Sequence, residues 1–188
     1  MSLKQKFGNS LISLAGWKIL TPSPNVPRYV AIAAPHTSNW DGYHLIVVGM
    51  AANVKLRWLG KHTLFRPPFG GVLKRLGGIP VRRSKHMGLV EQVAEFIKSQ
   101  DEIVVFVPPE GTRSRVETWK SGFYHIAMAA EVPIIPTYID YARKEAAFGE
   151  PIYPTGDLKA DMDKLRAFYD GVQGRHPELF ADPKLRDE

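Results

Sequence analysis

The chain has 188 residues, of which 44% are hydrophobic and 23% charged, a composition typical of one soluble globular domain with a substantial core. It contains no cysteine, which excludes disulfides, thiolate nucleophiles and cysteine-ligated metals. Residues 1–90 carry thirteen basic side chains and one acidic, whereas residues 91–188 carry twelve basic and eighteen acidic. The basic half predicts an anionic partner, and nucleic acid, anionic lipid headgroups and phosphorylated substrates all fit this charge.

The segment from Leu3 to Leu20 has the pattern of an amphipathic helix. Its apolar stripe is formed by Leu3, Phe7, Leu11 and Leu14, and its positive charge comes from Lys4, Lys6 and Lys18 with no acidic residue. Such a helix either packs on the domain core or lies in a membrane interface, and both interpretations stay open. We therefore treat residues 1–20 as an N-terminal helix and candidate membrane-surface anchor, and residues 21–188 as the main domain. No run reaches the roughly 18–20 apolar residues of a membrane span.

The remaining chain alternates between strand and helix patterns. After a proline-rich connector at 21–27, strands are expected at 29–34, 56–59, 79–81, 103–107 and 133–138, with an edge strand within 146–153. Helices are expected at 41–54, 87–99, 119–131 and 158–172, with a broken helical piece at 62–76 and a loosely structured tail from residue 176. This alternation predicts an α/β fold, a single domain with a mixed, largely parallel sheet flanked by helices.

One polar loop follows the first of these strands and contains His36 and Asp41. Asp41 is the only acidic residue among the first ninety, and it lies five positions after His36. A histidine and a carboxylate this close can act as a general base and the group that orients it. The alternative is that Asp41 or Asn39 caps the following helix and His36 is an ordinary loop residue. Capping and catalysis are compatible, so spacing alone does not decide between them.

A second polar loop, residues 108–115, follows the strand at 103–107. Its arginines lie beside glycine and a hydroxyl side chain, a combination that suits phosphate, although a solvated turn has the same composition. Open α/β sheets bind ligands at the carboxyl ends of their strands, where both loops are expected. The chain has no nucleophile elbow, no phosphate-binding P-loop and no histidine spacing typical of a metal site. Acyl transfer, phosphoryl transfer and hydrolysis all remain open on these residues alone.

Four blocks in order resemble those of the glycerolipid acyltransferases of the 1-acylglycerol-3-phosphate acyltransferase type, over residues 29–138. The first, 36–41, matches the H-x-x-x-x-D pattern, which is weak by itself. The second, 78–83, has a glycine, an apolar triplet and arginine; the third, 109–114, reads P-E-G-T-R-S and is specific; the fourth is 132–136. Two departures are Pro35, where many members have asparagine, and Arg82, where many have an acidic or polar residue.

The resemblance implies a role for each matching residue. His36 would be the general base toward an acceptor hydroxyl, and Asp41 would hold its tautomer and stabilise the imidazolium. The acceptor site would be formed by Arg83, Glu110, Gly111, Thr112 and Arg113. The fourth block would be a buried strand near the acyl chain. No cofactor and no metal are expected, because a thiolate leaves readily.

The resemblance also implies the partners. The donor would be acyl-CoA or acyl carrier protein, and the acceptor a lysophospholipid such as 1-acylglycerol 3-phosphate, in phospholipid biosynthesis at the inner face of the cell membrane. A different lyso-lipid acceptor is an open alternative. A non-catalytic peripheral protein that binds anionic lipid is another. Nucleic-acid binding is disfavoured because no motif supports it.

Overall fold

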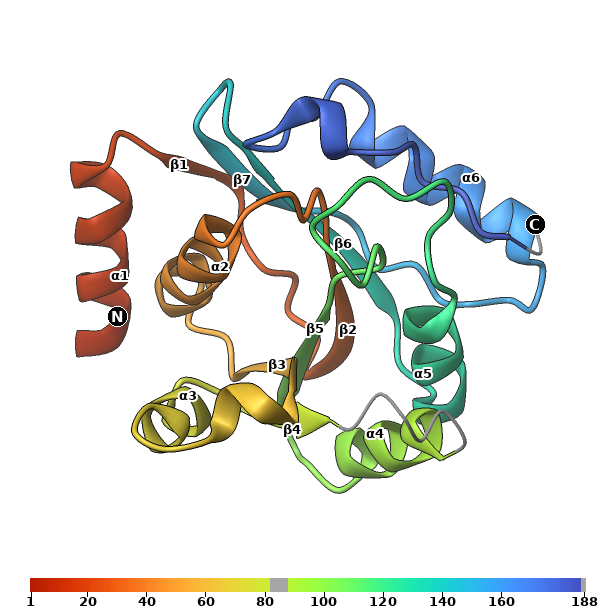
Figure 1. Cartoon of the computed structure of the whole chain (residues 1–188), viewed down its shortest axis with the longest axis horizontal. Coiled ribbons are helices and arrows are strands. Elements are labelled where there is room, and N and C mark those ends of the chain that lie inside the picture. The colour runs from red at the N-terminus through yellow and green to blue at the C-terminus, as the bar shows by residue number, and fades with distance from the viewer. Residues whose placement is uncertain (82–87, 187–188) are drawn as a thin grey trace.

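The computed structural model describes residues 1–81 and 88–186, and within these ranges seven strands form one sheet in the order β1-β7-β6-β2-β5-β3-β4 (Figure 1). The strands are β1 Lys18–Thr21, β2 Arg28–Ala33, β3 Leu56–Lys61, β4 Gly78–Val81, β5 Ile103–Val107, β6 Ile134–Asp140 and β7 Glu145–Phe148. Neighbouring strands are parallel except β6 and β7, which are antiparallel. The predicted α/β fold with a mixed, largely parallel sheet is therefore confirmed.

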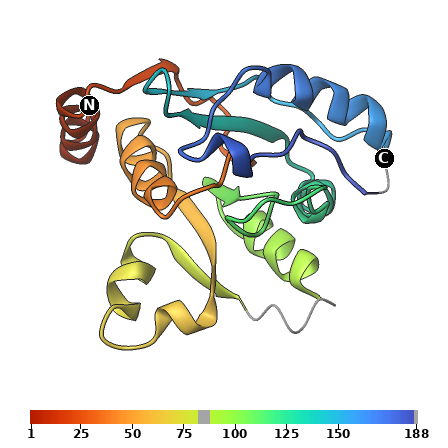
Figure 2. The ribbon, with the colours of Figure 1, turned by 45° about the horizontal axis from the view of Figure 1, so that its top comes forward.

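Helices cover both faces of this sheet. They are α1 Leu3–Leu14, α2 Trp40–Ala51, α3 Gly70–Arg75, α4 Leu89–Lys98, α5 Gly122–Ala130 and α6 Leu158–Tyr169, with 3-10 turns η1 His62–Phe65 and η2 Pro177–Leu179. Figure 2 shows α1 and α2 on one side of the sheet and α4, α5 and α6 on the other, while η1 and α3 project beside β3 and β4. None of the helices in the described ranges is long and apolar enough to cross a bilayer.

The central strand β2 divides the core into two clusters. Its Val30 and Ile32 pack in the cluster that includes α4, α5 and α6, whereas Tyr29 and Ala31 pack in the cluster that includes α1 and α2. Successive side chains of a strand point to opposite faces, so a strand buried on both sides reads as a continuous apolar run. This is the pattern by which the sequence predicted β2, β5 and β6.

The N-terminal prediction is partly wrong. The helix ends at Leu14 rather than Leu20, and Gly16 has a φ of +71°, a left-handed conformation that glycine adopts without strain. The chain then forms β1, which pairs in parallel with β7 and takes the edge position that the sequence assigned to residues 146–153. The helix itself packs on α2, because Gly8 and Ile12 are buried while Leu3, Phe7 and Leu14 are exposed.

The prediction of a loosely structured tail is also wrong. Leu185 is 1% exposed, and its neighbour Lys184 accepts a hydrogen bond of 2.7 Å from the Trp119 backbone N–H. Trp119, expected as the first residue of a helix, instead forms an isolated bridge with Leu185, and α5 begins at Gly122. Leu185 belongs to the same buried cluster as Trp119, so this end of the tail is anchored in the core.

The sheet order places the two polar loops side by side. Strand β2 pairs in parallel with both β5 and β6, so the carboxyl ends of these three strands lie at one edge of the sheet. The loop of His36 leaves β2 at this edge, and the loop at 108–115 leaves β5. Two segments more than seventy residues apart in sequence therefore meet at the position where open sheets bind ligands.

Candidate active site

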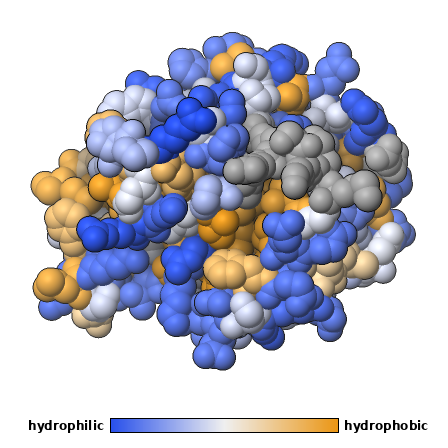
Figure 3. All heavy atoms as spheres, turned by 60° about the horizontal axis from the view of Figure 1, so that its bottom comes forward, coloured by the Kyte–Doolittle hydropathy of each residue, from blue (hydrophilic) through white to orange (hydrophobic). Residues whose placement is uncertain are grey.

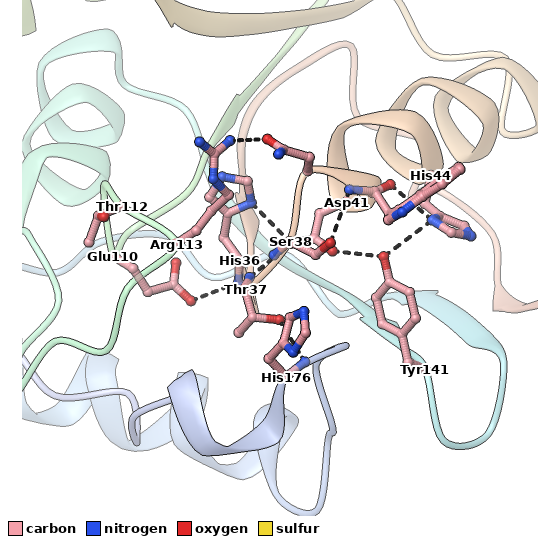
Figure 4. A network of polar contacts seen from close by, with 12 residues as sticks. His36, Thr37, Ser38, Asp41, His44, Glu110, Thr112, Arg113, Tyr141 and His176 are labelled. Carbon is pink, nitrogen blue, oxygen red and sulfur yellow. Dashed lines mark hydrogen bonds and ion pairs between the residues drawn. The ribbon is translucent and has the colours of Figure 1, made fainter.

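The His36–Asp41 loop folds back on itself around one carboxylate. Asp41 Oδ2 accepts hydrogen bonds from the backbone N–H groups of Thr37 and Ser38, both at 2.8 Å, and lies 3.2 Å from His36 Nδ1 (Figure 4). Asn39 occupies the N-cap position of α2 but makes no side-chain capping bond there. The predicted pairing of His36 with Asp41 is therefore present in the structure, and Asp41 also satisfies the backbone that precedes the helix.

The pair has the electrostatics of a base and its orienting acid. Burial works to raise the pKa of Asp41, but the hydrogen bonds from His36, the Ser38 N–H and Tyr141 hold it below its ordinary value, so the carboxylate is charged. A charged acceptor at Nδ1 favours the tautomer with the proton on Nδ1. This leaves His36 Nε2, on a ring 24% exposed, as the nitrogen that can accept a proton.

Glu110 holds the His36–Asp41 loop through a hydrogen bond to its backbone. Its Oε1 accepts a hydrogen bond of 3.0 Å from the His36 backbone N–H, and the residue is 3% exposed. Burial raises the pKa of Glu110 to about 7, against the lowering effect of the backbone hydrogen bonds that it accepts. The resemblance assigns Glu110 to the acceptor site, and in the structure its carboxylate contacts the main chain of His36.

The rest of the 108–115 loop faces outward beside His36. The guanidinium of Arg113 donates to Asn39 Oδ1, which ties this loop to the start of α2 (Figure 4). Thr112 Oγ1 accepts a hydrogen bond of 3.3 Å from the Ser114 N–H, which fixes the turn. Gly111 has a φ of +64°, and a side chain there would also approach the ammonium group of Lys120 to 2.8 Å.

A cavity of about 710 Å³ runs from these loops into the space between α2 and the sheet. Its polar end is lined by His36, Asn39, Asp41, Gly111, Thr112, Arg113 and Ser114. Its inner wall is apolar, with Leu45, Ile46, Trp58, Leu59, Leu64, Leu73, Phe106 and Ile139. The volume lies within the roughly 300–1,000 Å³ usual for small-molecule sites. A histidine, a cation and an apolar wall in one cavity can bind a molecule with an anionic head and an aliphatic chain.

The structure brings together most of the residues predicted for the site. His36, Asp41, Gly111, Thr112 and Arg113 line one cavity, and Glu110 lies beneath it. Arg83 falls outside the described residues, as does the departure at Arg82. Within the described ranges, no group of three or more histidine or acidic side chains is arranged to hold a metal ion.

Sequence reasoning missed two polar residues of the site. Lys61, at the end of β3, lines the cavity, and the general excess of basic residues in the first half was its only signal. Tyr141 donates a hydrogen bond of 2.8 Å from its hydroxyl to Asp41 Oδ1 (Figure 4). No pattern in the sequence indicates this contact, because the two residues are one hundred positions apart.

Comparisons with known proteins agree on one family. The family model described as Acyltransferase matches residues 21–140. The chain is 28% identical to the 1-acyl-sn-glycerol-3-phosphate acyltransferase of Haemophilus influenzae, in an alignment that covers 90% of this chain and 78% of the relative. It is 29% identical to the protein of the same name from Escherichia coli, over 69% of this chain and 55% of that one. It thus spans about half the length of the second relative.

A solved structure has the same fold. The crystal structure of the 1-acyl-sn-glycerophosphate (LPA) acyltransferase PlsC from Thermotoga maritima matches with a TM-score of 0.63 and 19% sequence identity, covering 88% of this chain and 76% of that one. At this identity the likeness concerns the fold.

Proposed function

This chain belongs to the acyltransferase family, and we propose that it moves a fatty acyl group from an acyl thioester to the free hydroxyl of a lysophospholipid, 1-acylglycerol 3-phosphate foremost, in phospholipid biosynthesis. The observation that most supports this substrate class is the cavity. It joins His36 and Arg113 at its polar end to a wall of apolar side chains that suits an acyl chain.

The chemistry needs one base and no covalent intermediate. His36 Nε2 accepts the proton of the lysophospholipid hydroxyl as its oxygen attacks the thioester carbonyl. The tetrahedral intermediate then expels the thiolate, which takes the proton from the imidazolium, so an ester and a free thiol are formed. Asp41 stabilises the imidazolium while it exists, through the contact of 3.2 Å at Nδ1. The thiol has an ordinary pKa of about 8.5, so it is a good leaving group.

Two cations on the cavity wall suit the phosphate of the acceptor. Arg113 lies beside His36 with its guanidinium held by Asn39, and Lys61 lies across the cavity at the end of β3. A planar guanidinium can bind two phosphate oxygens, and an ammonium adds a point charge. Arg83 stays a proposed third ligand on the basis of the second family block. Glu110 supports this site by accepting the hydrogen bond from the His36 backbone N–H.

We further propose that the chain binds an anionic membrane surface, at the inner face of the cell membrane, where its lipid acceptor resides. On α1, which carries Lys4 and Lys6 and no acidic residue, Leu3 and Leu14 are 87% and 85% exposed. In the segment formed by η1, α3 and the residues between them, Leu64, Phe69 and Val72 are also more than half exposed among basic residues. Figure 3 shows apolar surface gathered at the edge of the molecule where α1 lies. Exposed apolar side chains flanked by cations are typical of helices that lie in a membrane interface.

The test is direct. The full chain is incubated with a long-chain acyl-CoA and lysophosphatidic acid in mixed micelles, and free thiol and phosphatidic acid are both measured. We expect turnover, reduced about 10²–10⁴-fold in His36→Ala because a general base contributes that much. The matched control is His125→Ala, an exposed histidine on α5. Wild-type thiol release no higher than that of His36→Ala, across several donors and acceptors, would refute the proposal.

The preferred acceptor and donor are identified by testing alternative substrates in the same assay. Lysophosphatidylglycerol, lysophosphatidylcholine and glycerol 3-phosphate replace lysophosphatidic acid in turn, and acyl carrier protein replaces CoA. We expect lysophosphatidic acid to give the highest kcat/KM, because it alone in the panel combines a phosphate monoester, matched to two cations, with an acyl chain for the apolar wall.

A further inference from the structure

Tyr141 lies directly after the residues that the family model matches, yet its hydroxyl contacts the carboxylate that orients the base. It donates a hydrogen bond of 2.8 Å to Asp41 Oδ1, the oxygen turned away from His36 (Figure 4). The other oxygen, Oδ2, accepts from Thr37 and Ser38 and faces His36. We propose that Tyr141 is a positioning residue for the His36–Asp41 pair, an inference that rests on the proposed function in which His36 is the base.

The ring of Tyr141 is held rigidly on several sides. Trp17 packs against it edge-on, with ring centroids 5.2 Å apart and an interplanar angle of 89°, and His44 does the same at 5.3 Å and 76°. Its backbone N–H donates to Gln173 O at 3.0 Å, and the Gln173 N–H in turn reaches Asp140 Oδ2 at 3.3 Å. The hydroxyl therefore has a fixed direction, as a group that positions another must have.

The single hydroxyl proton belongs on the bond to Asp41. The alternative acceptor, His44 Nδ1, lies farther away at 3.3 Å, and that nitrogen also lies 3.0 Å from the backbone oxygen of Trp40. A carbonyl oxygen cannot donate, so His44 Nδ1 carries a proton and donates it to Trp40. This excludes Nδ1 as an acceptor, and the charged carboxylate is the stronger acceptor in any case. Burial lowers the pKa of His44, which favours its neutral form.

The hydrogen bond has two physical consequences for the base. It prevents the carboxylate from turning about its χ2 angle, so Oδ2 stays aligned with His36 Nδ1. It also draws negative charge toward Oδ1 and so weakens the pull of Oδ2 on the imidazolium. Removing it should loosen the geometry and, at the same time, make the carboxylate a better partner for the protonated histidine.

Other charged or titratable groups around the pair remain in place when only the hydroxyl is removed. Glu110 lies under the His36 backbone, and Arg113 reaches the loop through Asn39. The guanidinium carbon of Arg175, from the C-terminal segment, lies 5.9 Å from the centroid of the Tyr141 ring. His44 faces Tyr141 from α2. A change in pH dependence on loss of the hydroxyl is therefore attributable to its bond with Asp41.

The variant that tests the proposal is Tyr141→Phe, which keeps the ring and its packing. We expect kcat to fall about tenfold, because the lost alignment of Asp41 outweighs its stronger pull on the imidazolium, with little change in KM for either substrate. The acid limb of the kcat profile should move to higher pH, because the imidazolium is better stabilised. The matched control is Tyr43→Phe, which removes a hydroxyl from the exposed face of α2 and should change neither quantity.

Failure of this inference can be distinguished from failure of the proposed function. If the wild-type protein acylates no acceptor, the proposed function fails, but the ring signals of His36 can still be followed by NMR against pH. A titration displaced to higher pH in Tyr141→Phe, and unchanged in Tyr43→Phe, supports the positioning role without any assay of activity. An unchanged titration, or an active Tyr141→Phe enzyme with wild-type kcat and pH profile, overturns it.

Discussion

Replacement of Asp41 by asparagine isolates the charge of the orienting residue from its role in the loop. The amide oxygen can still accept the N–H groups of Thr37 and Ser38, so the loop keeps its backbone hydrogen bonds. What is lost is the negative charge 3.2 Å from His36 Nδ1. Two unit charges at that distance interact by about 5 kcal/mol at an effective dielectric constant of ~20. Because the neutral amide oxygen still accepts one hydrogen bond from the ring, we expect a net loss of about 3 kcal/mol, or roughly a hundredfold in kcat.

The assay is thiol release from acyl-CoA with lysophosphatidic acid, read as kcat and KM, together with a melting temperature for each variant. The matched control is Asp161→Asn, on α6. Asp161 is also buried and accepts the same kinds of donor, a tyrosine hydroxyl at 2.9 Å and a backbone N–H at 2.7 Å, but it does not line the cavity. Both variants should lose stability, and only Asp41→Asn should lose activity. An Asp41→Asn enzyme within tenfold of wild type, or an equal loss in Asp161→Asn, would refute the reasoning.

Three further predictions concern the cavity, the buried acid and the membrane surface. Gly42 lines the cavity, and a Cβ there would have no atom within 4 Å, so a side chain can occupy the cavity without a clash. Gly42→Leu should therefore lower the turnover of long-chain donors about tenfold more than that of short-chain donors. The control Gly122→Leu, at an equally open position on α5, should show no such difference. Burial raises the pKa of Glu110 from 4.5 to about 7. The contribution of this carboxyl group to the stability of the folded state is therefore fully present below pH 4.5 and is lost as the pH rises through 7. We therefore expect the free energy of unfolding of Glu110→Gln, relative to that of wild type, to be higher at pH 8 than at pH 4.5 by up to about 3 kcal/mol. Urea unfolding at both pH values measures this difference. A difference between variant and wild type that does not change with pH would contradict the prediction. Leu14→Glu should weaken sedimentation with phosphatidylglycerol vesicles more than Ser13→Glu, which adds the same charge at the neighbouring exposed position. Equal effects would mean that the apolar side chain of Leu14 contributes nothing to membrane binding.

The strands and the local part of the site could be predicted from the sequence. Strands buried on both faces leave uninterrupted apolar runs, so β5 was predicted with its observed bounds. His36 and Asp41 are close in the chain, and a five-residue loop can bring them together wherever it lies. The third family block identified Gly111, Thr112 and Arg113, which line the cavity beside His36.

The errors have a common origin. The N-terminal apolar stripe continues past Leu14, but the residues that follow gain more by pairing with β7 than by extending a helix. The tail lacks periodicity, yet Leu185 is buried against Trp119. In each case the decisive partner lies more than sixty residues away, and a window of neighbouring residues contains no trace of it.

The sequence by itself thus predicted the fold class, the proximity of His36 and Asp41, and the family, because each depends on residue types at short spacing. Only the tertiary structure decided that Glu110 lies beneath the His36 backbone rather than in the cavity, since this depends on β2 and β5 being parallel neighbours. It also decided that the second oxygen of Asp41 belongs to Tyr141, which reaches it from the turn after β6. Hydrogen bonds of this kind follow from strand register and packing, which bring distant segments together without leaving a local pattern in either of them.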